Sequence, residues 1–194
     1  MVTRPGERRV QILHTLAEML QDPKGEKITT AALAKRLDVS EAALYRHFAS
    51  KAQMYEGLIE FIEQTIFGLT NQIVAEQENG LAQLRGIVAM LLGFAEKNPG
   101  MTRVLIGDAL VNEDERLQAR INQLHDRIEA TLKQCLRLAA TQGGDAAPAA
   151  EPTDPGPQAN LILAYVVGRW HQFAKSGFRR KPTELADRQW PLLA

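Results

Sequence analysis

The sequence of 194 residues is 45% hydrophobic but only 6% aromatic, and its 23 basic side chains balance 23 acidic ones. This length allows a small domain joined to a medium one, and the richness in Ala, Leu, Glu, Gln and Arg predicts an all-α fold. No apolar run approaches the roughly 18 residues of a membrane span, the N-terminus lacks a signal-peptide pattern, and a single cysteine excludes an intramolecular disulfide framework. We therefore expect a cytoplasmic protein.

The first predicted helix runs from about Gly6 to Leu20, where apolar residues recur at spacings of three and four. The sequence Asp-Pro-Lys-Gly at 22–25 predicts its end, because proline cannot continue the helical hydrogen bonds and glycine accepts a positive φ. Between Met1 and Met54, nine basic residues against six acidic ones leave a net charge of +3. Because the whole chain is neutral, a nucleic-acid interface in this segment would depend on where its cations lie.

The stretch from Ile28 to Lys51 predicts two short helices joined by a tight turn, the arrangement of a helix-turn-helix. Thr29 or Thr30 can cap the first helix and Ser40 can cap the second, since their hydroxyl oxygens accept hydrogen bonds from first-turn amides. Asp38 stands at the turn position where most such sequences have glycine. Aspartate is among the few other residues that visit left-handed backbone geometry, so the turn is retained.

The second helix of this motif has the chemistry of a DNA reader. Small Ala42 and Ala43 would let it lie deep in the major groove, Glu41 can accept from a cytosine amino group, and Arg46 can bind guanine or phosphate. The candidate DNA-binding residues are Thr29, Thr30, Ser40, Glu41, Ala42, Ala43, Tyr45, Arg46, His47 and Lys51. One alternative is that Tyr45 and His47 only pack between helices, and another is that the stretch is an ordinary helical hairpin.

Residues 50–53, Ser-Lys-Ala-Gln, fit a capping box and begin a long helix to about Glu76. We expect it to connect a DNA-binding domain at 1–52 with a second domain at 53–194. Residues 141–157, rich in Gly, Ala and Pro, predict a mobile linker, and 174–194 form a tail. The remaining predicted helices are Leu81–Lys97, Met101 to about Leu110, Asp114–Ala140 and a last long helix around Leu161–Phe173.

The helix over 114–140 and the last long helix each have an apolar stripe that predicts a homodimer through a four-helix bundle. The expected dimer contacts are Leu117, Ile121, Leu124, Ile128, Tyr165, Trp170 and Phe173. The alternative is that both stripes pack within the monomer. His125, His171, Asp108 and Asp114 have no metal-ligand spacing, and no catalytic set is placed, so we expect no metal, no cofactor and no enzymatic activity.

The motifs of the helix-turn-helix carry a family resemblance. Ile28 to Lys51, with Leu-Tyr-Arg-His-Phe followed by Ser-Lys, resembles the DNA-binding domain of TetR-family regulators. Segments elsewhere resemble the nucleoid occlusion branch of that family: Leu-Ile-Glu-Phe-Ile-Glu at 58–63, Leu-Leu-Gly-Phe at 91–94, Asn-Pro-Gly at 98–100, Arg-Ile-Asn-Gln-Leu at 120–124 and Arg-Ile-Glu-Ala at 127–130. The N-terminal arm, interrupted by Pro5 and Gly6, and the Ala- and Pro-rich linker depart from the expected pattern.

The resemblance implies a nucleoid-associated homodimer whose two recognition helices read a palindromic DNA site in successive major grooves. It also implies that the DNA-bound protein engages the tubulin-like division protein FtsZ and blocks assembly of the division ring over the nucleoid. The partner-binding candidates, on two helices expected to lie side by side, are Phe61, Gly93, Phe94, Lys97 and Asn98. Each also has a structural interpretation as core, surface or helix stop. The alternative function is a ligand-responsive TetR-type transcriptional repressor without a protein partner.

Overall fold

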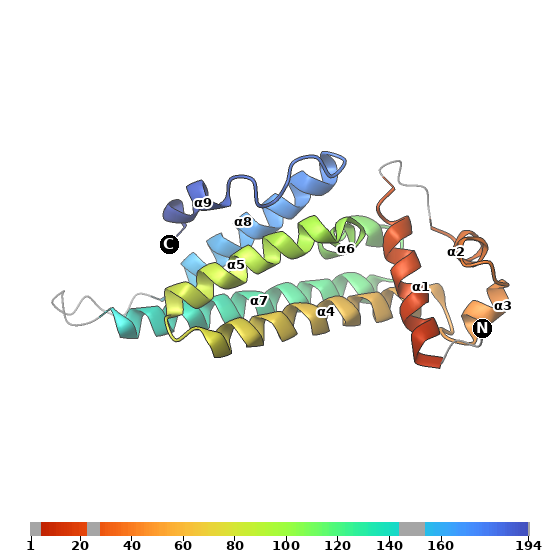
Figure 1. Cartoon of the computed structure of the whole chain (residues 1–194), viewed down its shortest axis with the longest axis horizontal. Coiled ribbons are helices and arrows are strands. Elements are labelled where there is room, and N and C mark those ends of the chain that lie inside the picture. The colour runs from red at the N-terminus through yellow and green to blue at the C-terminus, as the bar shows by residue number, and fades with distance from the viewer. Residues whose placement is uncertain (1–4, 23–27, 144–153, 194) are drawn as a thin grey trace.

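The computed structural model describes residues 5–22, 28–143 and 154–193, and within these ranges every regular element is helical (Figure 1). The prediction of an all-α fold is therefore confirmed. Three helices form a head at one end of the elongated molecule, and the helices that follow form a body that extends away from it. The head consists of α1 (Pro5–Met19), α2 (Thr30–Arg36) and α3 (Glu41–Tyr45).

The two short helices of the head begin at the caps that the sequence predicts. The Thr29 hydroxyl accepts a hydrogen bond from the backbone N–H of Ala32 at 3.1 Å, and the Ser40 hydroxyl accepts one from Ala43 at 3.3 Å. Between them Asp38 has a φ of 54°, so the left-handed turn residue is confirmed. These local interactions fix where α2 ends and where α3 begins.

The inner faces of α2 and α3 pack onto α1. Leu33 of α2, Leu44 of α3 and Phe48 just beyond it are each 1% exposed, and they belong to the same buried cluster as Ile12 and Leu16 of α1. Because one face of α3 is anchored in this way, its other face is left to solvent. The head therefore presents α3 at the end of the molecule (Figure 1).

A single helix, α4 (Lys51–Glu76), leads from the head into the body, with the bounds that the sequence predicts. The Ser50 hydroxyl accepts from the N–H of Gln53 at 3.2 Å, and the Gln53 side chain accepts from the N–H of Ala49 at 2.8 Å. In the usual capping box the N3 side chain accepts from the N–H of the cap residue itself, whereas here it accepts from the residue before the cap. The buried cluster continues along α4 without a break, through Leu58, Ile62 and Ile66 at 0% exposure.

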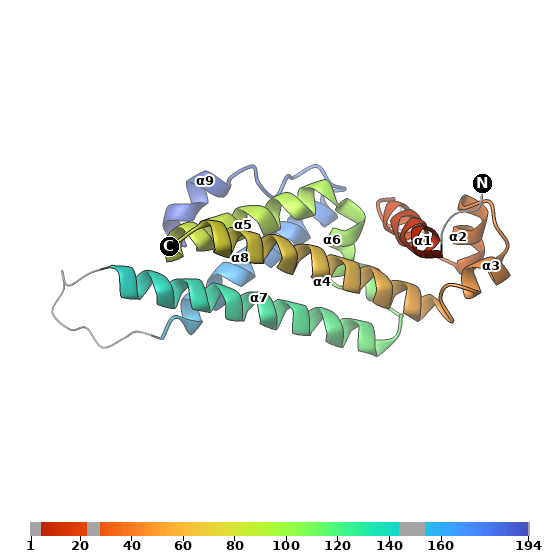
Figure 2. The same ribbon diagram turned by 60° about the horizontal axis from the view of Figure 1, so that its bottom comes forward.

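The body packs α5 (Gly80–Lys97), α7 (Glu115–Gln142) and α8 (Gly156–Lys175) with α4 (Figure 2). The predicted helix from Met101 to Leu110 is instead α6 (Pro99–Leu105), followed by the short 3₁₀ helix η1 (Asp108–Leu110). Gly107 separates them, because its φ of 76° is left-handed and cannot continue an α-helix. The predicted linker over 141–157 is too wide: α7 reaches Gln142 and α8 begins at Gly156, while residues 144–153 lie outside the described residues.

The apolar stripes expected at a dimer interface are buried within one chain. Leu117, Ile121, Leu124 and Trp170 are 0% exposed, and Ile128 and Phe173 are 2% exposed. The indole N–H of Trp170 donates to the backbone carbonyl of Leu91 at 3.1 Å, which ties α8 to α5. The prediction that these six side chains face a second copy is therefore wrong, because α7 and α8 pack against each other and against α5. Tyr165 is half-buried, and its hydroxyl donates to Gln189 at 2.9 Å.

The C-terminal tail folds back over α5 and α8 through α9 (Ala186–Gln189) and the 3₁₀ helix η2 (Trp190–Leu192) (Figure 1). Arg169 of α8 is 8% exposed, and its guanidinium donates to the carbonyls of Lys181 at 2.7 Å and Pro182 at 3.1 Å. The Thr183 hydroxyl donates to Glu96 of α5 at 2.6 Å. A buried cation that hydrogen-bonds two backbone carbonyls thus fixes the path of the tail.

Candidate nucleic-acid interface

The recognition helix α3 presents small side chains to solvent. Ala42 is exposed and Ala43 is half-buried, whereas Leu44 on the opposite face is 1% exposed. Tyr45 and Arg46 are also exposed, with Tyr45 at 46%. An exposed Tyr45 is inconsistent with the alternative in which it only packs between helices. The outer surface of α3 therefore combines two alanines with a phenol and a guanidinium at its C-terminal end.

Polar residues of α2 and α3 meet on this outer surface. The Thr30 hydroxyl donates to the Glu41 carboxylate at 2.6 Å, and the Tyr45 hydroxyl lies 3.5 Å from the Thr30 hydroxyl, at the outer limit of a hydrogen bond. Three predicted DNA-binding residues thus form one exposed cluster. The hydrogen bond from Thr30 holds the Glu41 carboxylate toward α2. The second carboxylate oxygen of Glu41 stays available to an amino donor.

Residues of α1 support the end of α3. The Arg9 guanidinium donates to the His47 carbonyl at 2.9 Å and lies 4.2 Å from the centroid of the Phe48 ring. The sequence does not identify Arg9 as a site residue, since His47 is 38 residues away from it. The His47 side chain is half-buried at this position. The cation–π contact and the hydrogen bond together orient the basic end of the recognition helix.

Lys51, one of the predicted DNA-binding residues, has an acidic partner in this structure. Its ammonium pairs with the Glu113 carboxylate, 62 residues later in the chain, and lies 5.6 Å from the centroid of the Tyr55 ring. Both charged side chains are sheltered, with Lys51 23% exposed and Glu113 14% exposed. The first residue of α4 is therefore bound to the segment that precedes α7.

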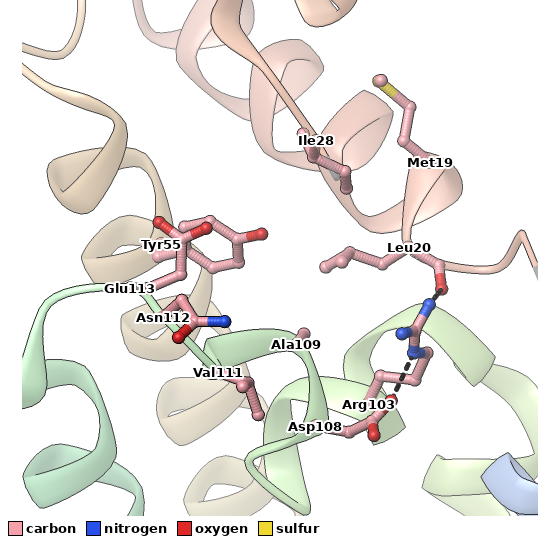
Figure 3. Close-up of a pocket in the computed structure, with 10 residues that line it drawn as sticks. All are labelled: Met19, Leu20, Ile28, Tyr55, Arg103, Asp108, Ala109, Val111, Asn112 and Glu113. Carbon is pink, nitrogen blue, oxygen red and sulfur yellow. Dashed lines mark hydrogen bonds and ion pairs between the residues drawn. The ribbon is translucent and has the colours of Figure 1, made fainter. Parts of the chain in front are cut away.

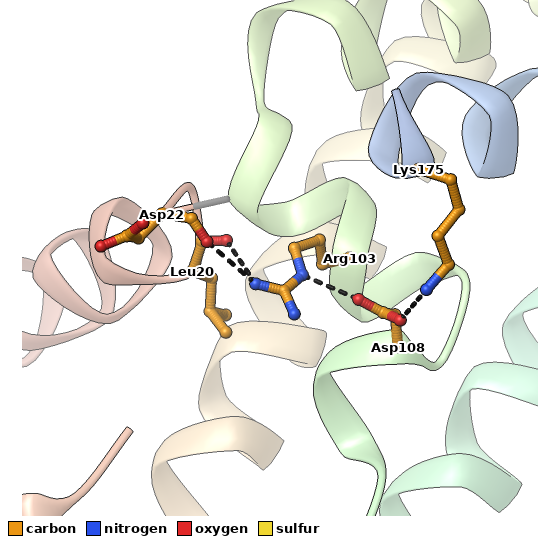
Figure 4. Close-up of polar contacts among 5 residues, drawn as sticks. All are labelled: Leu20, Asp22, Arg103, Asp108 and Lys175. Carbon is orange, nitrogen blue, oxygen red and sulfur yellow. Dashed lines mark hydrogen bonds and ion pairs between the residues drawn. The ribbon is translucent and has the colours of Figure 1, made fainter. Parts of the chain in front are cut away.

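A second polar connection joins α1 to α6. One guanidinium nitrogen of Arg103 donates to the carbonyls of Leu20 and Asp22, at 3.3 Å each, and another donates to Asp108 at 2.8 Å (Figure 4). Asp108 also pairs with Lys175 of α8. Partial burial acts to raise the pKa of Asp108, but the hydrogen bonds from Lys175 and Arg103 outweigh it, so this pKa is lowered. The carboxylate thus remains ionised between two cations.

Between these two connections lies a cavity of about 220 Å³, bounded by the end of α1, the start of α4 and the segment from η1 to α7 (Figure 3). The Tyr55 side chain is 2% exposed, and its hydroxyl points into this space. Burial, and then the charge of Glu113, raise the pKa of Tyr55, so the phenol stays neutral. We call this region, where α1 and the start of α4 meet α6 and residues 111–113, the seam.

The candidate partner-binding residues lie on α4 and α5, which pack side by side as predicted (Figure 2). Lys97 is exposed, Gly93 has open space beside it, and Phe61 is half-buried against the ring of His14 at a centroid distance of 6.0 Å. Phe94, however, is 7% exposed and belongs to the core, so its prediction as a surface contact is wrong.

Asn98, the fifth partner candidate, has a structural role at the junction of α5 and α6. Its side-chain amide donates to the Phe94 carbonyl at 2.8 Å, and its own carbonyl accepts from the N–H and the hydroxyl of Thr102. These bonds occupy the end of α5 and the start of α6, which Pro99 begins. The interpretation of Asn98 as part of a helix stop therefore accounts for its contacts.

Among residues 5–22, 28–143 and 154–193, no cluster of three or more His, Cys, Asp or Glu side chains is arranged to hold a metal ion. Within the same described ranges, no helix combines the length and the apolar character needed to cross a membrane. Cys135 is 2% exposed, and burial raises the pKa of its thiol, which is the environment of a packing residue.

A head with a helix-turn-helix, joined by one long helix to an all-helical body, defines a TetR-type regulator. Residues 12–58 match the family described as "Bacterial regulatory proteins, tetR family", and residues 78–194 match "Tetracyclin repressor-like, C-terminal domain". Nucleoid occlusion factor SlmA from Marinomonas sp. is 50% identical over 194 residues, covering 100% of this chain and 96% of the relative. SlmA from Alteromonas mediterranea is 52% identical over 183 residues, covering 94% and 92%. The chain belongs to the SlmA family of nucleoid occlusion factors, within the TetR family.

Solved structures share this fold at low sequence identity. The transcriptional regulator FadR from Bacillus subtilis, in complex with stearoyl-CoA, superposes with a TM-score of 0.77 at 16% identity, covering 95% of this chain and 96% of that one. AibR in complex with isovaleryl coenzyme A and operator DNA has a TM-score of 0.74 at 20% identity, covering 96% and 97%. At these identities the similarity establishes the fold alone.

Proposed function

We propose that this nucleoid occlusion factor binds palindromic chromosomal sites as a homodimer and, when bound to DNA, inhibits assembly of the FtsZ ring. The main support is a sequence identity of about 50% to SlmA relatives over nearly their full length. The exposed helix α3, with alanines on its outer face, adds to it. The protein acts by binding, without catalysis.

The head supplies the DNA contact in this proposal. Ala42 and Ala43 allow close approach to the groove floor and apolar contact with thymine methyls. Glu41, held by Thr30, accepts from a cytosine amino group, and Arg46 binds guanine or a neighbouring phosphate. Thr29 and Ser40 cap their helices, so their backbone amides rather than their hydroxyls are the groups left for phosphate.

Two copies of the chain are needed to read a palindrome with two recognition helices. Because the predicted stripes are buried, the dimer contact has to use another surface, and the outer face of α8 fits this requirement. Leu161 is 54% exposed, Ala164 is exposed, and Gly168 has open space beside it. These residues follow one another at spacings of three and four, so they share one face, and their small size permits close helix packing.

The partner contact in this proposal is the shallow surface between α4 and α5. Phe61 and the partly buried Met90 provide apolar area, Leu69 is 39% exposed, Gly93 keeps the surface low, and Lys97 adds a positive charge at one end. This surface begins beside the head, because Phe61 contacts His14 of α1. A partner bound there would be sensitive to the position of the head, which supports dependence on DNA.

The DNA-binding part is tested with Ala43→Glu, which places a carboxylate on the outer face of α3. We expect it to abolish binding to a palindromic duplex enriched from a random library, because the charge repels phosphate and blocks close approach. Ala75→Glu adds the same charge to an exposed position at the far end of α4 and should bind as the wild type does. Both should keep the wild-type circular dichroism spectrum. Duplex binding by Ala43→Glu at wild-type affinity would show that α3 is not the reader.

A further inference from the structure

The ion pair between Lys51 and Glu113 connects the head to the body shortly after the end of α3. Lys51 is the first residue of α4, immediately after the cap Ser50, and α3 ends six residues before it. Glu113 lies in the segment between η1 and α7, where its N–H donates to the Leu110 carbonyl at 3.0 Å. A cation at the start of a helix is well placed for phosphate, but here a carboxylate of the body occupies it.

We propose that Glu113 is a positioning residue for DNA binding, which holds the Lys51 ammonium against the body and competes with a DNA phosphate for it. This inference rests on the proposed DNA-binding function of the head. A lysine has one ammonium on a flexible stem, so it exchanges one anionic oxygen for another without rearranging the backbone. In the DNA-free chain the charges of Lys51 and Glu113 nearly cancel. Lys51 therefore attracts phosphate only when its ion pair with Glu113 opens.

The two polar connections at the seam differ in whether DNA can compete for them. Arg103 donates to the backbone carbonyls of Leu20 and Asp22 and to Asp108, and it belongs to α6 rather than to the head. None of the predicted DNA-binding residues takes part in these contacts. Lys51 alone among those residues pairs with an acidic side chain of the body, within the described part of the chain. The seam therefore has a fixed connection at α1 and an exchangeable one at α4.

When Lys51 exchanges Glu113 for a phosphate, the body is also affected. Glu113 is 14% exposed, so losing its partner leaves a sheltered carboxylate that must move toward water. The segment that would move begins with Val111, which is 68% exposed, and leads through the cap Asp114 into α7. DNA binding would thus alter the start of α7, which packs against α4 and α5. This supplies a physical link between the DNA-bound head and the partner surface.

The test measures binding of the full-length protein to a mixed-sequence duplex of about 30 base pairs over a range of salt concentrations, since phosphate contacts do not require a specific site. Glu113→Gln frees Lys51 while preserving side-chain size. We expect about fivefold tighter binding, as for the loss of one competing ion pair. The slope of log K against log salt should become steeper by about 0.9 for each subunit that gains a phosphate contact.

Glu63→Gln is the matched control. Glu63 pairs with Arg120 at 2.6 Å, with side-chain exposures of 16% and 31%, close to those of the Glu113 pair, but both residues lie in the body. We expect its affinity and slope to equal those of the wild type. In a Lys51→Gln background, Glu113→Gln should have no effect, because the competition requires the ammonium. A similar gain in that background would mean that Glu113 acts only as a distant negative charge, which overturns the proposal.

Two outcomes separate this inference from the function on which it rests. Failure of the wild type to bind any duplex would refute the DNA-binding function itself. Binding by the wild type, with Glu113→Gln indistinguishable from Glu63→Gln, would refute only the role of Glu113. If Glu113→Gln fails to fold, Glu113→Asp retracts the carboxylate by one methylene while keeping its charge. We then expect Glu113→Asp also to bind the duplex more tightly. An unchanged slope of log K against log salt would refute competition between Glu113 and phosphate.

Discussion

Gly100 of α6 lies tightly against α1, and replacing it with alanine tests this contact between body and head. A Cβ atom at this position would lie 1.9 Å from the carbonyl oxygen of Ala17 and 3.2 Å from the Cβ of Leu20, both in or beside α1. The nearest group is backbone, so it cannot rotate away as the end of a flexible side chain would. Gly100→Ala therefore requires α1 and α6 to separate.

The magnitude follows from two opposing effects. Alanine in place of a helical glycine stabilises by about 0.5–1 kcal/mol, whereas forcing a methyl group into a filled contact costs about 1–3 kcal/mol, and a backbone contact this short favours the upper end. We expect Gly100→Ala to lower the free energy of unfolding by roughly 2 kcal/mol. For a protein of this length, that corresponds to a fall in Tm of about 4–8 °C.

The assay is thermal unfolding followed by circular dichroism, with all variants at one protein concentration because the stability of a dimer depends on it. Gly68→Ala is the matched control, since Gly68 lies within α4 and an added Cβ would meet nothing within 4 Å. We expect Gly68→Ala to raise Tm by about 1–4 °C through helix propensity alone. If Gly100→Ala were as stable as Gly68→Ala, the tight contact between α1 and α6 would be refuted.

Two further predictions concern His125 and Lys97. Burial lowers the pKa of His125, so the unfolded chain takes up a proton first, and stability should fall as pH drops below about 6.5, by at most about 1.4 kcal/mol per pH unit. His125→Gln should flatten this dependence in urea titrations, whereas His14→Gln should keep it. Lys97→Glu should abolish inhibition of FtsZ while leaving duplex binding intact. Arg137→Glu, at another exposed position, should change neither FtsZ inhibition nor duplex binding. Equal pH dependence in both histidine variants, or FtsZ inhibition by Lys97→Glu, would contradict these assignments.

The helix-turn-helix could be predicted in detail because its signals are local. The caps Thr29, Ser40 and Ser50 act within three residues, and the turn at Asp38 depends on the backbone preferences of one residue. Such interactions are determined by residues that are adjacent in sequence, so spacing alone identifies them. The extent of α4 followed for the same reason, since its cap and its periodicity lie within one segment.

The dimer stripe was predicted wrongly because periodicity identifies the buried face of a helix but not what covers it. Trp170 and Leu124 have the spacing of an interface, yet the helices of the same chain cover them. The Glu113 partner of Lys51 could not be predicted for a related reason, because Glu113 is 62 residues away in sequence and no local pattern links the two. Contacts across the seam depend on the tertiary fold and require the structure.

In the proposed function, DNA binding by the head enables inhibition of FtsZ by the body. Sedimentation of FtsZ polymers formed with GTP, with and without this protein and its enriched palindromic duplex, tests it most directly. We predict a strong reduction of sedimented FtsZ only when the wild type and the duplex are both present, and no reduction with Ala43→Glu. Equal FtsZ polymer in all mixtures would contradict this function, and release of the duplex by a small metabolite would then favour a ligand-responsive repressor.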